Sequence, residues 1–250
     1  MRRKEEKILF ICLKKHSVSF VVINGYLEVK QTATIRELAR LLYTSEASVR
    51  RDIAALEMQG CVQKTYGGVL LSKYQNQVVP VNLRDGENSS AKDELARRAA
   101  QMIRDGDTVI IDASSTTRRI IKYIAHLHNV KIITNNLRIF SECSNPHITL
   151  YCTGGTYYHG NHAFIGPAAE AYIRGISADY LFFSSQGITE DGIISDVSEE
   201  ESSLRRIMIK QSEKQFFLCD SSKIGIRKMF TLCNKDELTG VICDKKLPWE

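Results

Sequence analysis

Hydroxyl side chains gather at the end of one apolar stretch in the second half of the chain. Residues 108–111 read Thr-Val-Ile-Ile, which is typical of a strand buried on both faces, and Asp112 follows them. The next hydroxyl residues are Ser114, Ser115, Thr116 and Thr117. Hydroxyl donors, free backbone N–H groups and a helix N-terminus together suit a phosphate group. The segment therefore indicates a phosphate-binding loop, against the more common role of such residues as helix caps.

Polar residues also follow three other apolar stretches of this half. They are Asn135 after 130–134, Gly154 and Gly155 after 148–152, and the run from Asp220 to Lys223 after 215–219. In an open sheet of parallel strands, ligands bind at the carboxyl ends of the strands. Any one of these groups would more often form a turn or a cap. Together, and with the positive charge of Lys223, they favour a small anionic ligand.

Strands and helices alternate through this half of the chain. The predicted strands cover 108–112, 130–134, 148–152, 180–184, 215–219 and 240–243. The predicted helices cover 92–102, 118–127 and a segment that ends near 143. Alternation of this kind indicates an α/β fold with an open, mostly parallel sheet and right-handed crossovers. The uncharged segment 143–169, rich in Gly and Tyr, is interpreted as a pocket or as the interior of the sheet.

Three helices are predicted near the N-terminus. The first runs from Val21 to about Gln31, where its apolar periodicity ends. Thr34 is the predicted N-cap of the second helix, and Glu37, three residues later, completes a capping box. Ser45 is the predicted N-cap of the third helix.

The third helix, predicted from Ser45 to Met58, is followed by a short ribbon. The helix has apolar residues at helical spacing, and these are Val49, Ile53 and Leu56, with Gly60 at its end. Residues 61–66 alternate like a strand, Gly67 and Gly68 form a turn, and 69–71 return as a second strand. This order is that of a winged helix-turn-helix, in which the helix from Ser45 enters the major groove of DNA.

Arg50 and Arg51 are the predicted centre of DNA recognition. Adjacent residues point about 100° apart on a helix, so the two cannot both be buried, and one could reach a base while the other contacts a phosphate. The alternative is that Arg-Arg-Asp is only a solvated helical face. The predicted DNA-binding residues are Ser45, Glu46, Ser48, Arg50, Arg51, Lys64, Tyr66, Gly67 and Gly68.

These patterns predict four parts of the chain. Residues 1–20 form an N-terminal extension to which no role is assigned. Residues 21–75 form the winged helix-turn-helix, 76–91 form a linker in which periodicity fails, and 92–250 form the α/β domain.

Composition limits the class of protein. The chain has 250 residues, of which 43% are hydrophobic and 25% charged, with a formal net charge of +5. These values exclude a collagen-like or disordered chain and allow an anionic partner. No apolar stretch has the ~18 residues that a membrane helix needs, and the stretch behind Arg2 and Arg3 is too short for a signal peptide.

Cysteine and histidine patterns give no cofactor. The seven cysteines are scattered and include no Cys-x-x-Cys pair, which favours reduced thiols in a cytoplasmic protein over disulfides or a zinc site. His159 and His162 lie in a Gly-rich loop without a third ligand nearby, so no metal is expected. No phosphate-binding P-loop, GxSxG or HExxH motif is present.

Ordered motifs in both halves resemble the DeoR-type bacterial repressors of sugar operons. In the first half they are Thr34-Ile-Arg-Glu-Leu-Ala, the run from Ser45 to Gly60, and Lys64-Thr-Tyr-Gly-Gly68. In the second half they are Asp105-Gly-Asp107, Asp112 with Thr116-Thr117, Thr134-Asn135-Asn136, Gly154-Gly155, Phe164-Ile-Gly-Pro167, Ala178-Asp179, Gly187-Ile188, Glu201 and Asp220-Ser-Ser-Lys223. The resemblance covers the chain from about residue 21 to its end.

The resemblance implies a repressor whose sensor domain has the fold of sugar-phosphate isomerases and binds a phosphorylated sugar as inducer. The expected effector-binding residues are Asp112, Ser114, Ser115, Thr116, Thr117, Asn135, Gly154, Gly155, Glu201, Asp220 and Lys223. Arg50 and Arg51 take the DNA-reading positions. The chain departs from the family at Ser114, where Gly is usual, and at Thr44, where an apolar residue is usual.

The chain is therefore expected to be a cytoplasmic, dimeric or larger repressor of a carbohydrate operon, released from operator DNA by a sugar phosphate. The alternative is a sugar-phosphate isomerase-like enzyme, in which Glu201 or Asp112 would act as a base near Lys223. An activator remains open, because that role depends on where the operator lies relative to the promoter.

Overall fold

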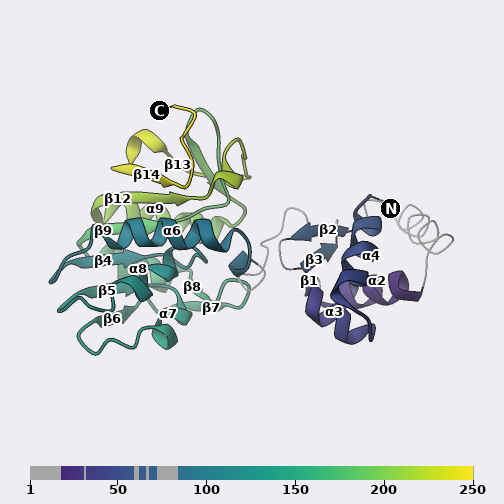
Figure 1. The fold of residues 1–250 in the computed structure, drawn as a ribbon. Helices are drawn as coiled ribbons and strands as arrows, with labels where there is room; N and C mark the ends of the chain where they lie inside the picture. The colour runs from purple at the N-terminus through teal and green to yellow at the C-terminus, as the bar shows by residue number, and fades with distance from the viewer. Residues whose placement is uncertain (1–17, 31, 59–61, 66–67, 72–83, 250) are drawn as a thin grey trace. The chain divides into compact units, whose positions relative to one another are not determined.

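The computed structural model describes residues 18–30, 32–58, 62–65, 68–71 and 84–249, as drawn in Figure 1. The chain divides into two compact units, Met1–Glu87 and Asn88–Glu250. We call them the N-terminal unit and the C-terminal unit.

The described part of the N-terminal unit combines three helices with a small antiparallel sheet. The elements are α2 (Val18–Lys30), β1 (Thr32–Thr34), α3 (Ile35–Leu41), α4 (Glu46–Met58), β2 (Val62–Thr65) and β3 (Gly68–Leu71). The strand order is β1-β3-β2, so the predicted two-stranded ribbon has a third strand. Ala33 pairs with Val69 because the residues just before the Thr34 cap are extended. Gly60, Tyr66 and Gly67 lie outside the described residues.

Local sequence signals fix the ends of these helices. The predicted capping box is confirmed: Thr34 Oγ1 accepts a hydrogen bond from Glu37 N (3.1 Å), and Glu37 Oε2 accepts one from Thr34 N (2.7 Å). The predicted inward face of α4 is confirmed as well, since Val49, Ile53 and Leu56 are fully buried. They pack with α2 and α3 side chains in one core.

The C-terminal unit is built on a six-stranded parallel sheet. Its strands are β4 (Thr108–Ile111), β5 (Lys131–Thr134), β6 (Thr149–Cys152), β9 (Ala178–Phe183), β12 (Ser212–Cys219) and β14 (Gly240–Cys243). Their order is β14-β12-β9-β4-β5-β6, and every pairing is parallel. The predicted open parallel sheet is therefore confirmed, with apolar strands at its centre that are buried on both faces.

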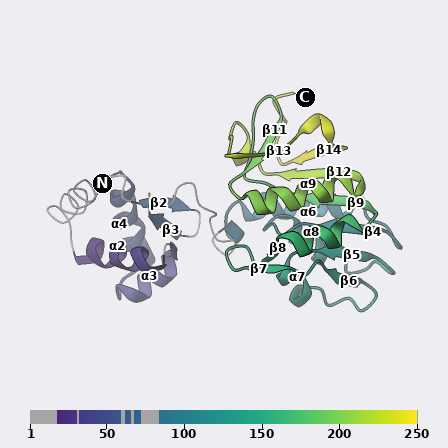
Figure 2. The ribbon, with the colours of Figure 1, turned by 180° about the vertical axis from the view of Figure 1, so that it is seen from behind.

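Helices cover both faces of this sheet. The helices on one face are α6 (Ser89–Ala100), the 3-10 helix η2 (Thr117–Tyr123) and α7 (Leu137–Glu142). Those on the other face are α8 (Pro167–Arg174) and α9 (Glu199–Lys210). Figure 1 shows α6 in front of the sheet, and Figure 2, from behind, shows α8 and α9 in front. The predicted α-helix 118–127 is thus shorter and of the 3-10 type, and the helix predicted from Lys92 begins at Ser89.

Smaller elements at the rim of the sheet were not predicted from the sequence. They are a hairpin of β7 (Thr156–Tyr158) and β8 (Ala163–Ile165), a three-stranded antiparallel sheet of β10 (Gly187–Ile188), β11 (Ile193–Asp196) and β13 (Phe230–Asn234), and the 3-10 turns η3 (Ser221–Lys223) and η4 (Lys235–Glu237). The segment 143–169 contains β6, the hairpin and the start of α8. Its interpretation as sheet interior is wrong for β6, which is an edge strand with Tyr151 39% exposed.

Candidate functional site

The outer face of α4 carries the predicted DNA-reading residues. Ser45 precedes the helix, and its Oγ accepts a hydrogen bond from Ser48 N (3.2 Å), as expected of an N-cap. Arg50 and Arg51 both lie on the exposed side. Arg51 Nη2 donates to Ser48 Oγ (3.2 Å). The helix therefore presents two guanidinium groups and two hydroxyls to solvent.

The charges on this face are held by weak pairs. Glu46 lies between two arginines, with Arg50 Nη2 at 3.6 Å and Arg36 Nε at 3.6 Å from its carboxylate oxygens. All three side chains are at least 45% exposed, and ion pairs of this kind contribute little to stability. Both arginines can exchange Glu46 for a phosphate group at small cost.

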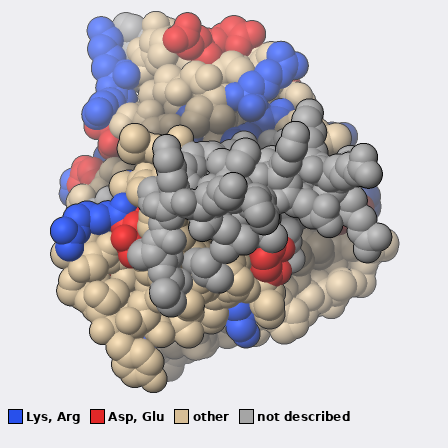
Figure 3. Space-filling view, turned by 90° about the vertical axis from the view of Figure 1, so that its right-hand side faces the viewer, with Lys and Arg blue, Asp and Glu red and all other residues tan. Residues whose placement is uncertain are grey.

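Lys64 ties the wing to α4. Its backbone N donates to Glu57 Oε1 (2.8 Å), and its Nζ lies 3.5 Å from Glu57 Oε2. Gly68 begins β3, and the wing tip at Tyr66 and Gly67 lies outside the described residues. On the face drawn in Figure 3, basic and acidic side chains are interspersed.

The carboxyl ends of the central strands lie in register. Ile111 pairs with Thr134 and with Phe182, and Thr134 pairs with Cys152. The loops that follow these strands therefore leave the sheet at one edge, which is where ligands bind in parallel sheets. This brings together the predicted effector residues that follow β4, β5 and β6.

The loop after β4 is buried and holds its own shape. Thr117 N donates to Ser114 Oγ (3.0 Å), and Thr117 Oγ1 donates to Asp112 Oδ1 (2.6 Å). The hydroxyls of Ser114 and Thr117 are therefore used within the loop. Ser115 is 4% exposed, and the Oγ1 of the fully buried Thr116 has no hydrogen-bond partner in the described structure.

Asp112 forms a buried ion pair that the sequence analysis did not foresee. Arg205, on α9, donates from Nε to Asp112 Oδ2 (2.8 Å) and from Nη1 to Asp196 Oδ2 (3.0 Å). The three side chains are 6%, 1% and 2% exposed. Burial alone would lower the pKa of Arg205, but the facing carboxylates, Asp112 first, raise it above its usual value. Both oxygens of Asp112 are thus engaged inside the protein.

Asn135 follows β5 and has one end of its amide committed. Its Nδ2 donates to Phe164 O (3.1 Å) on β8, and its backbone O accepts from Phe164 N (2.8 Å). This fixes the amide orientation, because the NH₂ end must face the carbonyl. Oδ1 is buried and has no partner among the described residues. Buried polar atoms almost always have a partner, so Asn135 Oδ1 and Thr116 Oγ1 are candidates to bind a ligand or water.

Gly154 and Gly155 shape the edge of the site. Both have positive φ angles, +64° and +108°, which glycine adopts without strain. A Cβ on Gly155 would lie 2.7 Å from Ile165 O, so this residue allows β8 to approach. Glu201 is 3% exposed, and its Oε1 accepts from Asn161 Nδ2 (2.6 Å), which ties the hairpin loop to α9.

Lys223 brings the positive charge that the sequence predicted. Its Nζ donates to Ser184 Oγ (2.8 Å) and lies 3.6 Å from Asp220 Oδ2. Ser184 N in turn donates to Asp112 Oδ2 (3.3 Å), so Lys223 is linked to the loop after β4. Burial would raise the pKa of Asp220, but Lys223 and hydrogen bonds from Ser222 and Asn88 hold it below its usual value.

Several residues of this site were missed by sequence reasoning. They are Asn161, Ser184, Ser185, Asp196 and Arg205. Ser184 and Ser185 carry the same signal as the predicted loops, since they are polar residues directly after the apolar strand β9. Arg205 and Asp196 carry no such signal.

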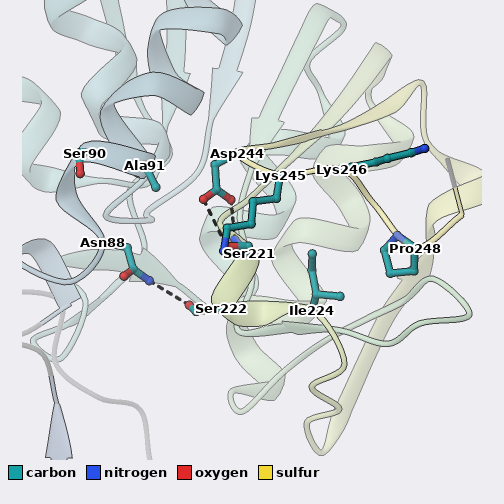
Figure 4. Close-up of a pocket in the computed structure, with 10 residues that line it drawn as sticks. All are labelled: Asn88, Ser90, Ala91, Ser221, Ser222, Ile224, Asp244, Lys245, Lys246 and Pro248. Carbon is teal, nitrogen blue, oxygen red and sulfur yellow. Dashed lines mark hydrogen bonds between the residues drawn. The ribbon is translucent and has the colours of Figure 1, made fainter.

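The C-terminal unit also has a separate pocket beside η3, shown in Figure 4. It has a volume of about 740 Å³ and is lined by Asn88, Ser90, Ala91, Ser221, Ser222, Ile224, Asp244, Lys245, Lys246 and Pro248. None of the predicted effector residues lines it. Three hydrogen bonds join its lining residues: from Asn88 Nδ2 to Ser222 Oγ (3.0 Å), from Ser221 N to Asp244 Oδ1 (2.6 Å) and from Ser221 Oγ to Asp244 Oδ2 (3.2 Å).

The histidine and cysteine side chains can be placed within the described structure. No group of three or more His, Cys, Asp or Glu side chains suited to a metal occurs there. His162 Nδ1 instead shares a hydrogen bond of 2.6 Å with the Tyr157 hydroxyl. The five described cysteines are free, and burial raises the pKa of Cys233 to about 12. Within the same residues, no helix has both the length and the apolar character to span a bilayer.

Comparison with known proteins gives matches over both units. The model of the DeoR-like helix-turn-helix domain matches residues 22–75, and that of the DeoR C terminal sensor domain matches residues 87–245. The chain is 29% identical over 222 residues to the HTH-type transcriptional regulator GolR of Listeria innocua, covering 88% of this chain and 87% of that protein. It is 30% identical over 212 residues to the lactose phosphotransferase system repressor of Staphylococcus epidermidis, with 83% and 84% covered.

Solved structures give weaker similarity. A D-ribose-5-phosphate isomerase in complex with phospho-erythronic acid has a TM-score of 0.41 at 11% identity, over 54% of each chain. The eIF2B delta subunit of Chaetomium thermophilum has a TM-score of 0.47 at 14% identity, over 80% of this chain and 63% of that one. Both scores are below 0.5 and carry no weight for function. The two domain models, which together span most of the chain, show that it belongs to the DeoR family of helix-turn-helix transcription regulators.

Proposed function

We propose that this regulator is a repressor of carbohydrate-utilisation genes and that a phosphorylated sugar releases it from its operator. Its relatives support the first part, because one of them is named as the repressor of a lactose phosphotransferase system. The isomerase-like alternative fits less well, since the chain belongs to a family of transcription regulators and Asp112, one candidate base, is locked by Arg205.

One observation carries the effector proposal: two buried polar atoms at the carboxyl edge of the sheet have no hydrogen-bond partner among the described residues. Thr116 Oγ1 can donate to a phosphate oxygen, and Asn135 Oδ1 can accept from a sugar hydroxyl. Lys223, from the neighbouring η3, adds the positive charge that a phosphate requires. A phosphorylated polyol offers the donors and acceptors that this set of groups needs.

The remaining effector-site residues have supporting roles in this proposal. Asp112 and Glu201 hold the site through Arg205 and Asn161 and do not contact the ligand directly. Gly154 and Gly155 let the hairpin approach. Ser114 and Ser115 supply backbone N–H groups, whereas the N–H of Thr117 holds the loop through Ser114 Oγ. Asp220 orients Lys223.

The proposal keeps the predicted division of the chain. A DNA-binding domain at 21–75, a linker at 76–91 and an effector domain at 92–250 are supported by family models that match 22–75 and 87–245. A single helix-turn-helix reads one half-site, so we propose a homo-oligomer that acts in the cytoplasm. Effector and operator must then weaken each other's binding by the same factor.

The test replaces Thr116 with valine, which removes the hydroxyl at nearly constant volume. An unpartnered buried hydroxyl is destabilising, so Thr116→Val should melt at or above the wild-type temperature without ligand. A panel of phosphorylated sugars is first screened for the one that most raises the melting temperature of the wild type. At a hundredfold excess over Kd this ligand should stabilise the wild type by about 2.7 kcal/mol, and Thr116→Val should lose that stabilisation.

Thr149→Val is the matched control, because Thr149 is exposed on the edge strand β6. It should keep the ligand response. The functional assay measures release of the protein by the ligand from a DNA duplex, which is first selected by the protein from a random pool. The proposal is wrong if Thr116→Val is released at the wild-type ligand concentration, or if no phosphorylated sugar stabilises the wild type.

A further inference from the structure

The turn between α3 and α4 holds a tyrosine where glycine is the usual residue. After the C-cap Leu42, Tyr43 N donates to Arg40 O (3.3 Å) and Thr44 N donates to Ala39 O (3.0 Å). This pair of bonds defines a Schellman motif, with Tyr43 at the position that must be left-handed. Its φ is +50°.

This backbone conformation is unfavourable for any residue with a side chain. In the left-handed region the Cβ crowds the following carbonyl oxygen, and only glycine escapes the penalty. A bulky residue there is an outlier that often marks a functional position. The intramolecular contacts of Tyr43 should therefore explain its presence if its role is structural.

Tyr43 has almost no such contacts. The residue is 98% exposed. Its hydroxyl has no hydrogen-bond partner in the described part of the chain, and no ring contact or cation–π pair involves it there. Among the described residues, neither packing nor hydrogen bonding offsets the unfavourable backbone, which points to a role with a partner.

The surroundings of Tyr43 identify the chemistry of that partner. A shallow pocket of about 440 Å³ beside the ring is lined by Arg36, Ala39, Arg40, Tyr43, Thr44 and Glu46. The Arg36 side chain is 76% exposed, and Arg40 is exposed with no ion-pair partner among the described residues. Glu46 opens the recognition helix α4, so the pocket adjoins the face that carries Arg50. In a helix-turn-helix, the first helix crosses the DNA backbone while the second enters the groove.

We propose that Tyr43, Arg36 and Arg40 form a contact surface for the phosphate backbone of DNA, separate from the groove-facing side of α4. The Tyr43 hydroxyl donates a hydrogen bond to a phosphate oxygen, and the two guanidinium groups neutralise the flanking phosphates. The proposal depends on DNA binding by the helix-turn-helix and is independent of the sugar response.

The test uses the full chain and a random-sequence duplex of about 30 base pairs at low salt, because phosphate contacts do not depend on sequence. Tyr43→Gly should bind this duplex about tenfold more weakly, as expected for loss of one hydrogen bond to a charged group. The same variant should melt at a higher temperature without DNA, since glycine relieves the left-handed strain. If Tyr43 had only a structural role, the variant would not combine weaker DNA binding with a higher melting temperature.

Salt dependence separates the tyrosine from the arginines. Tyr43→Gly and Tyr43→Phe should leave the slope of log K against log salt unchanged, whereas Arg40→Ala should reduce it by about 0.9. Tyr43→Phe keeps the ring and the backbone strain, so it should lose the affinity without gaining stability. Val29→Ala is the control for removal of an exposed side chain, because Val29 is 80% exposed on α2, and it should change neither quantity.

Three outcomes overturn the proposal. The first is wild-type DNA affinity for Tyr43→Gly. The second is a lower melting temperature for that variant, which would mean that the side chain stabilises the fold. The third is wild-type affinity for Tyr43→Phe, which would mean that the hydroxyl does not contact DNA.

Discussion

Replacing Arg205 with methionine should reveal how much the C-terminal unit depends on one buried cation. The guanidinium lies 2.8 Å from Asp112 Oδ2 and 3.0 Å from Asp196 Oδ2, and all three side chains are at most 6% exposed. Methionine has a similar length and leaves both carboxylates without a counter-charge. Because α9, β11 and the loop after β4 meet at this cation, its loss acts on three segments at once.

The expected loss is about 3–5 kcal/mol of unfolding free energy, the usual result of removing one partner from a buried pair. The matched control is Arg174→Met, because Arg174 is 59% exposed and pairs with Glu170 at 3.1 Å. That substitution should cost no more than about 1 kcal/mol. Adding Asp112→Asn and Asp196→Asn to Arg205→Met should restore much of the loss, since the uncompensated charges are then gone.

The assay is urea unfolding followed by the fluorescence of Trp249, the single tryptophan, which packs against the core between the sheet and α9. The signal therefore reports on the C-terminal unit.

Two results would refute this reasoning. Arg205→Met could unfold within about 1 kcal/mol of the wild type, as an exposed pair would. Alternatively, adding Asp112→Asn and Asp196→Asn to Arg205→Met could restore none of the loss, which would mean that the carboxylates are not left uncompensated.

Two further perturbations test the other surfaces. Arg50→Ala should weaken binding to the selected duplex by about 1–3 kcal/mol without changing the melting temperature, because Arg50 is exposed. Unchanged binding in a gel-shift titration would show that α4 is not the recognition helix. Asp220→Asn should lower the unfolding free energy at neutral pH, because the pKa of Asp220 is held below its usual value in the folded protein. The stability that the Asp220 carboxylate contributes is present above its unfolded pKa and is lost as pH falls through its folded pKa. The difference between Asp220→Asn and the wild type should therefore vanish in acid, and a constant difference would contradict it.

The sequence predicted the elements whose signals are local. Apolar runs located the central strands to within a few residues, and the strand predicted at 240–243 has those bounds. The capping box at Thr34 and the apolar face of α4 depend on side chains three or four residues apart, so periodicity was sufficient.

Elements that depend on distant partners were missed. The helix α9 was also not predicted, although it carries a local pattern of buried Leu204, Ile207 and Met208 at helical spacing after the cap Ser198. The short strands β10, β11 and β13 are stabilised by one another and by the main core, and they carry no strong pattern alone. The 3-10 form of η2 follows from a bond of three-residue spacing, from Arg119 N to Thr116 O (3.2 Å).

For the candidate site too, local signals were predictive and tertiary contacts were not. Polar residues after strands were found because parallel topology brings strand ends to one edge. The roles of those residues could not be predicted, because they depend on tertiary partners. Asp112 was predicted to bind an effector, and its pairing with Arg205, 93 residues away in sequence, could not be read from the local pattern.

The topology of the parallel sheet has a consequence for the order of folding. The central strand β4 pairs with β9, far along the chain, where Val109 meets Tyr180, so the sheet cannot close until distant segments have met. The N-terminal unit forms its helices and sheet from nearby segments. Chains with mostly local contacts fold faster than those with distant pairings. During synthesis, the DNA-reading helix would therefore fold before the domain that is proposed to bind the effector. Newly made chains would then bind DNA before they respond to a ligand.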